Sequence, residues 1–149
     1  MANGAIGRKE LLIGGGVVLV LALATIPFMT GPSTEGLRDE VPQYVNALRE
    51  KELQLHKALG EDYRAAAWAP RDPAKLTGQP VAWEGNRDFV KIGWEPADTA
   101  KVYGTYTVTV ADGGFIVKGS CDLDGDGRRA TWVATQDEPA KRTSDPDVY

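Results

Sequence analysis

Three aspartates alternate with other residues in a short acidic segment: Asp122, Asp124 and Asp126, with Gly127 directly after them. They occupy the first, third, fifth and sixth places of a calcium-loop pattern, in which carboxylate oxygens on a tight turn ligate a hard cation. The twelfth place, where a bidentate glutamate completes such a loop, holds Val133. The segment therefore indicates either a Ca²⁺ site or a β-turn rich in Asp and Gly, which tolerate turn dihedrals. We expect no other cofactor.

Residues of catalytic type are otherwise sparse. His56 is the single histidine, so a two-histidine metal motif is excluded, and its place in a charged helical pattern favours a solvated residue. Glycines 14–16 lie inside an apolar run, so they do not form a phosphate-binding loop ahead of a helix. The single cysteine, Cys121, alternates in phase with Val117 and Leu123, which favours a buried small hydrophobe. We expect a protein that is not an enzyme.

The charge balance of the chain excludes one large class of partner. Asp and Glu number 21 against 17 Lys and Arg, which gives a formal net charge of −4. A general nucleic-acid binder would carry a basic surface instead. We therefore expect no nucleic-acid partner.

The longest apolar run covers residues 11–29, nineteen positions without a charge. As a helix it would be about 28 Å long, close to the hydrocarbon thickness of a bilayer. Arg8 and Lys9 precede it, which favours a cytoplasmic N-terminus and a C-terminal domain on the other side of the membrane. The run predicts a single-pass membrane anchor behind a leader of residues 1–10.

A secretory signal is the alternative interpretation of the same segment. Ala22, Leu23 and Ala24 form a small-x-small cleavage pattern. Cleavage there would release a secreted domain that begins at Thr25. The pattern lies inside the apolar run, which continues to Met29, so the anchor is favoured.

The helical pattern resumes beyond the apolar run. Apolar residues recur at spacings of three, four and seven between Leu37 and Leu59, which places them on one helix face, and Gly60 is a plausible stop. Three prolines in residues 69–80 indicate a loop.

A period of two follows this loop. It predicts about four strands: around residues 90–94, 102–110, 115–123 and 129–135, with a tight turn at 112–114. The predicted fold class is α+β, a long N-terminal helix (transmembrane, then amphipathic) packed on a roughly four-stranded antiparallel sheet. Residues 30–135 would form this domain and 136–149 a flexible tail.

Two regions of the chain resemble type IV pilins. The opening Glu10-Leu11-Leu12-Ile13, with Pro27 further along, is similar to the start of a pilin helix. Four segments resemble the sheet of a pilin-like group in some Gram-negative bacteria: 92–96 (IGWEP), 103–106 (YGTY), 121–127 (CDLDGDG) and 130–132 (ATW). Together the two regions extend over most of residues 10–135.

The resemblance implies a processing site and a residue for assembly. Counting back from Glu10, the leader would be cut between Ala5 and Ile6, with Ala5 where the family has glycine. Arg8 and Lys9 stand where the family has apolar residues. Glu10 would inherit the family's role in subunit assembly; at a helix start it would also be favoured by the helix dipole alone.

The expected function is that of a fimbrial, type IV pilin-like subunit with a structural role in a pilus or pseudopilus. The protein would lie in the inner membrane with its C-terminal domain in the periplasm, and its partners would be the membrane and other pilin-like subunits, or copies of itself, bound through the N-terminal helix. One alternative is a bitopic membrane protein that does not polymerise and whose periplasmic domain binds a partner or calcium. The other is the secreted domain released near Ala24.

Overall fold

The computed structural model describes residues 34–149, apart from 61, 85 and 98–100. The chain divides into two units, Met1–Ser33 and Thr34–Tyr149, and every described helix and strand belongs to the second. The predicted leader, the predicted membrane-spanning run and the residues Ala5, Ile6 and Glu10 lie outside the described residues. None of the described helices is long and apolar enough to cross a membrane.

The helix α2 (Thr34–Leu59) extends over 26 residues, with Pro42 inside it. The predicted apolar stripe is present, since Val41, Val45 and Leu48 are fully buried. The helix ends at Gly60, which has a φ of +62° and donates its N–H to the carbonyl oxygen of His56 at 2.9 Å. A glycine suits this place because the left-handed conformation is strained for other residues.

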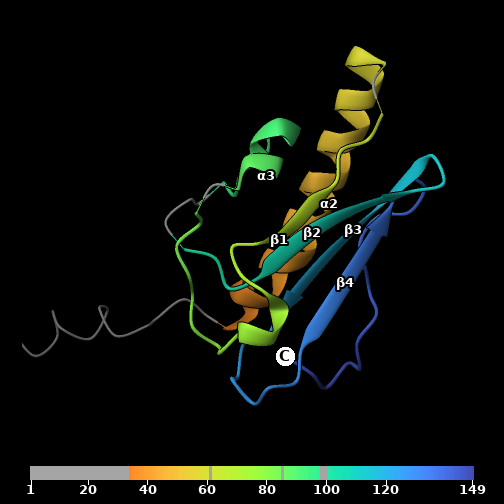
Figure 1. Cartoon of the computed structure of the whole chain (residues 1–149). Helices are drawn as coiled ribbons and strands as arrows, with labels where there is room; N and C mark the ends of the chain where they lie inside the picture. Colours follow the sequence, from red (N-terminus) through yellow and green to blue (C-terminus); the bar gives the residue numbers. More distant parts are fainter. Residues whose placement is uncertain (1–33, 61, 85, 98–100) are drawn as a thin grey trace, which may run out of the picture. The chain divides into compact units, whose positions relative to one another are not determined.

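The sheet contains five antiparallel strands in the order β1-β2-β3-β4-β5, and α2 packs against one of its faces (Figure 1). The strands are β1 (Ala66–Ala69), β2 (Thr105–Ala111), β3 (Gly114–Cys121), β4 (Ala130–Thr135) and β5 (Lys141–Arg142). The predicted turn at residues 112–114 is confirmed. Asp112 and Gly113 have positive φ angles of 53° and 76°, as a two-residue turn between twisted strands requires.

The predicted fold class is wrong in its strand number and in its helix. The sheet has five strands instead of about four, and the described helix α2 begins at Thr34 and is not apolar enough to span a membrane. The two outer strands, β1 and β5, contain four and two residues. Runs this short have too few alternations to stand out in a sequence.

One predicted strand is a helix. Residues 87–92 form α3 (Arg87–Ile92), which begins at the N-cap Asn86 and ends at Gly93 in the left-handed conformation. Phe89 and Ile92 are buried, whereas Val90 is 69% exposed. The alternation around residues 90–94 is short, and a three-residue spacing of buried positions fits a helix turn as well as alternation fits a strand.

The last residues are part of the packed domain. β5 pairs with β4 through Trp132↔Arg142 and Val133↔Lys141, and Val148 is only 7% exposed. The segment 136–149, predicted to be a flexible tail, thus supplies the fifth strand and a core residue. The segment is polar and contains two prolines, so its sequence does not indicate a strand. The pairing of β5 with β4 involves only two residues of β5.

The helix approaches the sheet closely because two strand-side residues lack side chains. A Cβ at Gly119 would lie 2.5 Å from Cγ2 of Val45 and 2.7 Å from Cγ1 of Val41. A Cβ at Gly104 would lie 2.7 Å from Cγ2 of Val41. The two valines therefore occupy the space above these glycines, at distances that no other residue type allows.

An aromatic cluster fills the core beside this contact. The rings of Tyr44, Trp94 and Tyr106 meet pairwise at centroid distances of 5.7–5.8 Å with steep interplanar angles. Trp83 and Phe89 continue the cluster toward α3. Edge-to-face contacts of this kind add to the free energy of simple burial.

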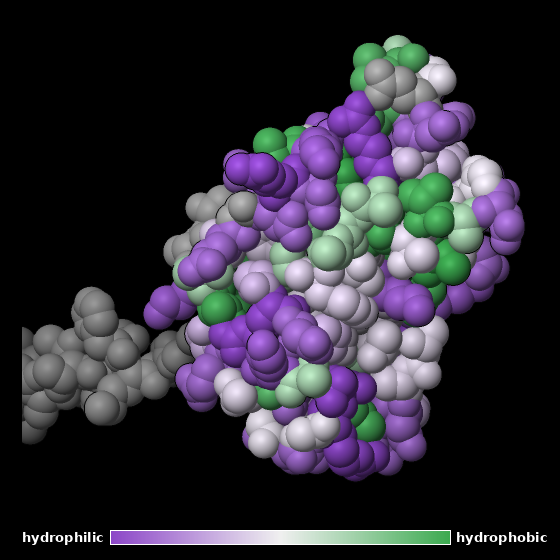
Figure 2. Space-filling model, viewed as in Figure 1, coloured by the Kyte–Doolittle hydropathy of each residue, from purple (hydrophilic) through white to green (hydrophobic). Residues whose placement is uncertain are grey.

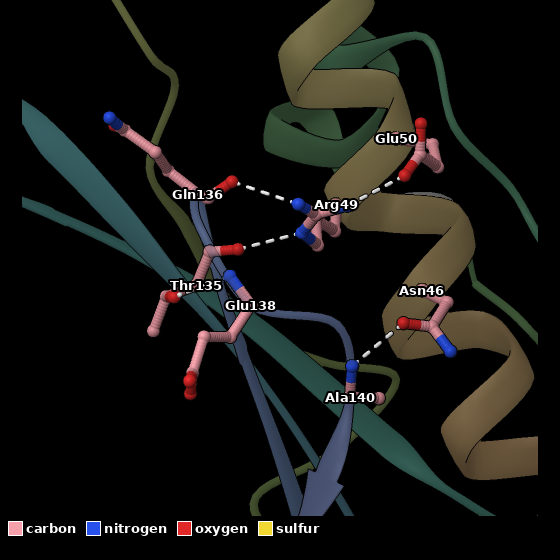
Figure 3. A network of polar contacts seen from close by, with 7 residues as sticks. All are labelled: Asn46, Arg49, Glu50, Thr135, Gln136, Glu138 and Ala140. Atoms are coloured by element: carbon pink, nitrogen blue, oxygen red, sulfur yellow. Dashed lines mark hydrogen bonds and ion pairs between the residues drawn. The ribbon is translucent and has the colours of Figure 1, made fainter.

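Polar side chains of α2 fix the helix to the ends of strands. Arg49 donates to the carbonyl oxygens of Thr135 at 2.8 Å and Gln136 at 2.9 Å, and Oδ1 of Asn46 accepts the N–H of Ala140 at 2.8 Å (Figure 3). These bonds join α2 to the end of β4 and the segment that leads to β5.

Glu40 makes the corresponding contact at the start of β2. Its Oε1 accepts the N–H groups of Tyr103 at 2.9 Å and Gly104 at 3.0 Å, and the hydroxyl of Tyr106 at 3.1 Å. Hydrogen bonds to a carboxylate are stronger than neutral ones. Glu40 thus holds the helix at the strand end opposite to the one that Arg49 holds.

Glu52 is a buried carboxylate with an incomplete set of partners. It is 1% exposed, its Oε2 accepts the N–H of Arg64 at 3.1 Å, and its Oε1 has no hydrogen-bond partner among the described residues. Burial raises the pKa of Glu52, against the smaller lowering effects of the Arg64 N–H and charge. The folded protein therefore holds this proton more tightly than the unfolded chain.

Replacing Gly119 with alanine should lower the free energy of unfolding by about 2–3 kcal/mol, because the added methyl group pushes α2 away from β3. Urea unfolding followed by tryptophan fluorescence measures the change. Gly114→Ala in the same strand is the control, since a Cβ there would lie 3.2 Å from the side-chain oxygen of Gln136 and in ordinary contact, at 3.8 Å, with the carbonyl oxygen of Ala111. In a Val45→Ala background, Gly119→Ala should lower the free energy of unfolding by less than it does in the wild type. An equal decrease in the wild type and in Val45→Ala would contradict a direct contact between the two positions.

The stability of the protein should carry a pH-dependent contribution from Glu52. Because the folded state binds the Glu52 proton more tightly than the unfolded chain, protonated Glu52 stabilises the fold. This stabilisation is complete below about 4.5, the pKa of an ordinary glutamate, and is lost as the pH rises through the higher pKa of the folded state. Glu52→Gln should remove it and make the protein more stable than the wild type at pH 7. Unfolding curves between pH 4 and 8 measure this, with the exposed Glu95→Gln as control. A variant less stable than the wild type at pH 7 would contradict it.

Candidate functional site

The three predicted ligand residues come together in the loop between β3 and β4. Carboxylate oxygens of Asp122, Asp124 and Asp126 all lie within 4.8 Å of one another. This spacing suits an ion that takes each oxygen at about 2.3–2.6 Å. Asp122 is buried, and the other two are exposed.

Asp122 organises the loop from within. Its Oδ1 accepts the N–H of Gly125 at 2.7 Å and its Oδ2 accepts the N–H of Gly127 at 3.1 Å. Both glycines have positive φ angles, 73° and 86°. The backbone thus turns around this carboxylate, as the turn interpretation of the sequence predicts.

The two exposed aspartates also bond to the backbone. Asp124 accepts the N–H of Asp126 at 3.3 Å, and Asp126 accepts the N–H of Arg128 at 2.7 Å. Within the described residues, no hydrogen bond is recorded for the second oxygen of either carboxylate, and both residues are exposed. Val133, at the twelfth place of the calcium pattern, pairs with Lys118 and Lys141 inside the sheet. The loop therefore offers three carboxylates and no closing glutamate.

A second loop supports the acidic loop, and the sequence carried no signal for it. A Cβ at Gly78 would lie 3.1 Å from the backbone nitrogen of Gly125, and Gly78 has a φ of +70°. The carbonyl oxygen of Thr77 lies on the other side of the same contact, 3.3 Å from a Cβ at Gly125. Two glycines 47 positions apart in the chain thus let two backbones touch.

A cavity of about 270 Å³ lies next to the acidic loop. Its lining residues come from the first turns of α2, from β3, β4 and the loop between them, from β5 and from the last residue: Arg38, Asp39, Pro42, Cys121, Leu123, Ala130, Trp132, Arg142 and Tyr149. The sequence did not single out Arg38, Arg142 or Tyr149, since these residues meet only in the folded chain.

Cys121 is fully buried, as predicted. Burial, with a further contribution from the charge of Glu40, raises the pKa of its thiol to about 12. Only the thiolate is a good nucleophile or ligand, so this group is a packing residue at neutral pH.

The remaining residues of catalytic type are placed as packing or surface groups. His56 is exposed and stacks on Tyr63 at a centroid distance of 4.6 Å. Trp94 and Trp132 are 9% exposed and belong to the core. Comparisons with protein-family models, curated proteins and solved structures found no match to this chain.

The loop geometry predicts weak Ca²⁺ binding, with a dissociation constant of roughly 1 mM, because three carboxylates supply few of the six to eight oxygens that the ion takes. Isothermal titration calorimetry measures it. Asp126→Asn should abolish the heat, whereas Asp137→Asn, an exposed aspartate outside the loop, should leave it unchanged. No heat and no thermal stabilisation at millimolar Ca²⁺ would show that the loop is a turn alone.

Proposed function

We propose that this chain is a membrane-anchored, type IV pilin-like subunit with a structural role in a pilus or pseudopilus. One observation carries the proposal: the apolar run 11–29 is separated by only four residues from a helix that packs along an antiparallel sheet. An anchor followed at once by a helix fixed to a sheet suits a subunit that is held by its N-terminal segment.

The attachment of α2 to the sheet supports this role. Glu40 binds the start of β2, and Arg49 binds the end of β4, so polar contacts hold the helix at both ends of the strands. The buried valines Val41 and Val45 lie between them. A force applied to the N-terminal segment would therefore load the whole domain rather than peel one helix from it.

The face of the sheet opposite α2 offers a surface for neighbouring subunits. On this face β2, β3 and β4 present Thr109, Ile116, Lys118, Val133 and Thr135, which are exposed or half-buried. Figure 2 shows pale and hydrophobic surface over the middle of the strands, with hydrophilic residues around it. A largely uncharged, flat face is typical of a surface that other proteins contact.

The resemblance to pilins supports the same proposal through residues with clear structural roles. Trp94, from the IGWEP segment, packs in the aromatic cluster. Asp122, from the CDLDGDG segment, organises the loop between β3 and β4. These two segments of the resemblance therefore contribute to the framework of the domain.

Glu10→Ala should reduce the amount of the protein in filaments sheared from its own cells by about tenfold or more, while the amount in the membrane fraction stays the same. Loss of one assembly contact of about 1.4 kcal/mol per subunit gives a change of this size. Quantitative immunoblotting of sheared and membrane fractions measures it. Glu84→Ala, an exposed glutamate of the described domain, is the matched control.

Unchanged incorporation of Glu10→Ala would remove the assembly role of that residue. Wild-type protein that resists carbonate extraction yet is absent from the sheared fraction would favour the bitopic protein that does not polymerise. A soluble periplasmic product would favour the secreted domain.

A further inference from the structure

Two arginines that form no ion pair with any described acidic side chain line the cavity beside the acidic loop. The Cζ atom of Arg38 lies 3.9 Å from the centroid of the Tyr149 ring, and that of Arg142 lies 5.0 Å from the same centroid. Arg142 also lies 5.4 Å from the ring of Trp132. The aromatic faces hold both guanidinium groups, and both groups line the cavity of about 270 Å³.

The hydrogen bonds of Arg142 go to neutral acceptors. Its Nε donates to Oγ of Ser144 at 3.2 Å, and its Nη2 donates to the carbonyl oxygens of Asp145 at 3.0 Å and of Val148. These bonds fix the guanidinium group and leave its Nη1 donors available. The arginine is therefore positioned in advance, which lowers the entropic cost of binding a ligand.

Arg38 has still more donors available. Within the part of the chain that the structure describes, its only recorded contact is the ring of Tyr149, and neither arginine forms an ion pair. Arg38 is exposed, so the cavity is open to solvent on this side. A guanidinium group that lies over a ring can still offer N–H donors to a planar or tetrahedral anion.

The acidic groups nearby do not neutralise these charges. Asp39 lines the cavity but is exposed and forms no ion pair with either arginine. Asp122, next to Cys121 in the chain, uses both oxygens for the N–H groups of Gly125 and Gly127. Asp39 is the one carboxylate side chain among the lining residues that the structure describes, and the charges of Glu40, Asp122 and Asp124 act on the lining residue Cys121 from nearby.

We propose that this cavity binds a phosphate group of a small phosphate ester, with Arg38 and Arg142 as its ligands. Two guanidinium groups can donate several hydrogen bonds to the oxygens of one phosphate, whereas an ammonium group acts as a single point charge. The volume is close to the lower end of the range for small-molecule sites, about 300–1,000 Å³. Pro42, Leu123 and Trp132 supply an apolar wall for the ester's short carbon portion.

The phosphate ester could come from a soluble metabolite or from a lipid headgroup, which present the same chemistry. The site depends on residues 38–149 alone, so the proposal stands whether or not the chain is a pilus subunit. Its test is separate from the test of assembly.

The full chain, purified in a neutral detergent without phosphate, is titrated with inorganic phosphate, with glycerol 3-phosphate and with phosphatidylglycerol added to the micelles. Thermal unfolding and calorimetry follow each titration against chloride at equal ionic strength. We expect a phosphate-dependent rise in the unfolding temperature. Arg38→Gln should weaken phosphate binding by about tenfold or more, as expected for loss of a charged hydrogen bond.

Arg38→Gln should fold normally, since Arg38 is exposed and, among the described residues, its one recorded interaction is with the ring of Tyr149. Arg87→Gln, an exposed arginine on α3, is the matched control and should bind like the wild type. Saturation by glycerol 3-phosphate would support the site and identify a soluble ester as ligand; a response to phosphatidylglycerol alone would support the site and identify a lipid headgroup. Equal effects of phosphate and chloride, or unchanged phosphate affinity in Arg38→Gln, would overturn the proposal.

Discussion

The close approach of α2 to the sheet above Gly119 and Gly104 is the contact on which the rest of the domain depends. Val41 and Val45 fill the space that side chains at these glycines would occupy. Because the helix axis is fixed at this distance, the aromatic rings of the core meet edge to face beside it. A wider spacing would leave the interior below normal packing density.

The same contact determines which polar bonds can form. Glu40 reaches the start of β2 and Arg49 reaches the end of β4 only because the helix lies close to the strands. These groups bind main-chain atoms, so they constrain the backbone of the strand ends directly. Glu52 is the exception, a buried carboxylate with one oxygen left without a partner. Its burial costs stability, and the surrounding apolar packing offsets that cost.

Much of the domain could be predicted from local patterns. The helix stripe ending at Gly60, the turn at residues 112–114 and the burial of Cys121 each follow from spacing or residue type within a few positions. The calcium-type spacing also located the loop in which, among the described residues, three carboxylates gather. Such features are visible in a sequence because the residues that create them are neighbours.

The features that could not be predicted depend on distant contacts. β5 is two residues long and is defined by its pairing with β4. α3 has a pattern that fits a strand equally well, and its caps, Asn86 and Gly93, decide between the two. The cavity combines Arg38 with Arg142, which are more than 100 positions apart. Residues that are far apart in the chain leave no pattern in a short stretch of sequence. The number of strands and the arginine site can therefore be seen only in the folded chain.

We propose that the chain is held by its N-terminal segment as a subunit of an assembly. Mass spectrometry of the N-terminus of the protein isolated from its own cells would show whether this segment is retained and where it is cut. We predict a chain that begins at Ile6, which makes Glu10 its fifth residue. A chain that begins at Thr25 would contradict the claim because the anchor would be gone, and an uncut N-terminus would contradict processing into a filament subunit.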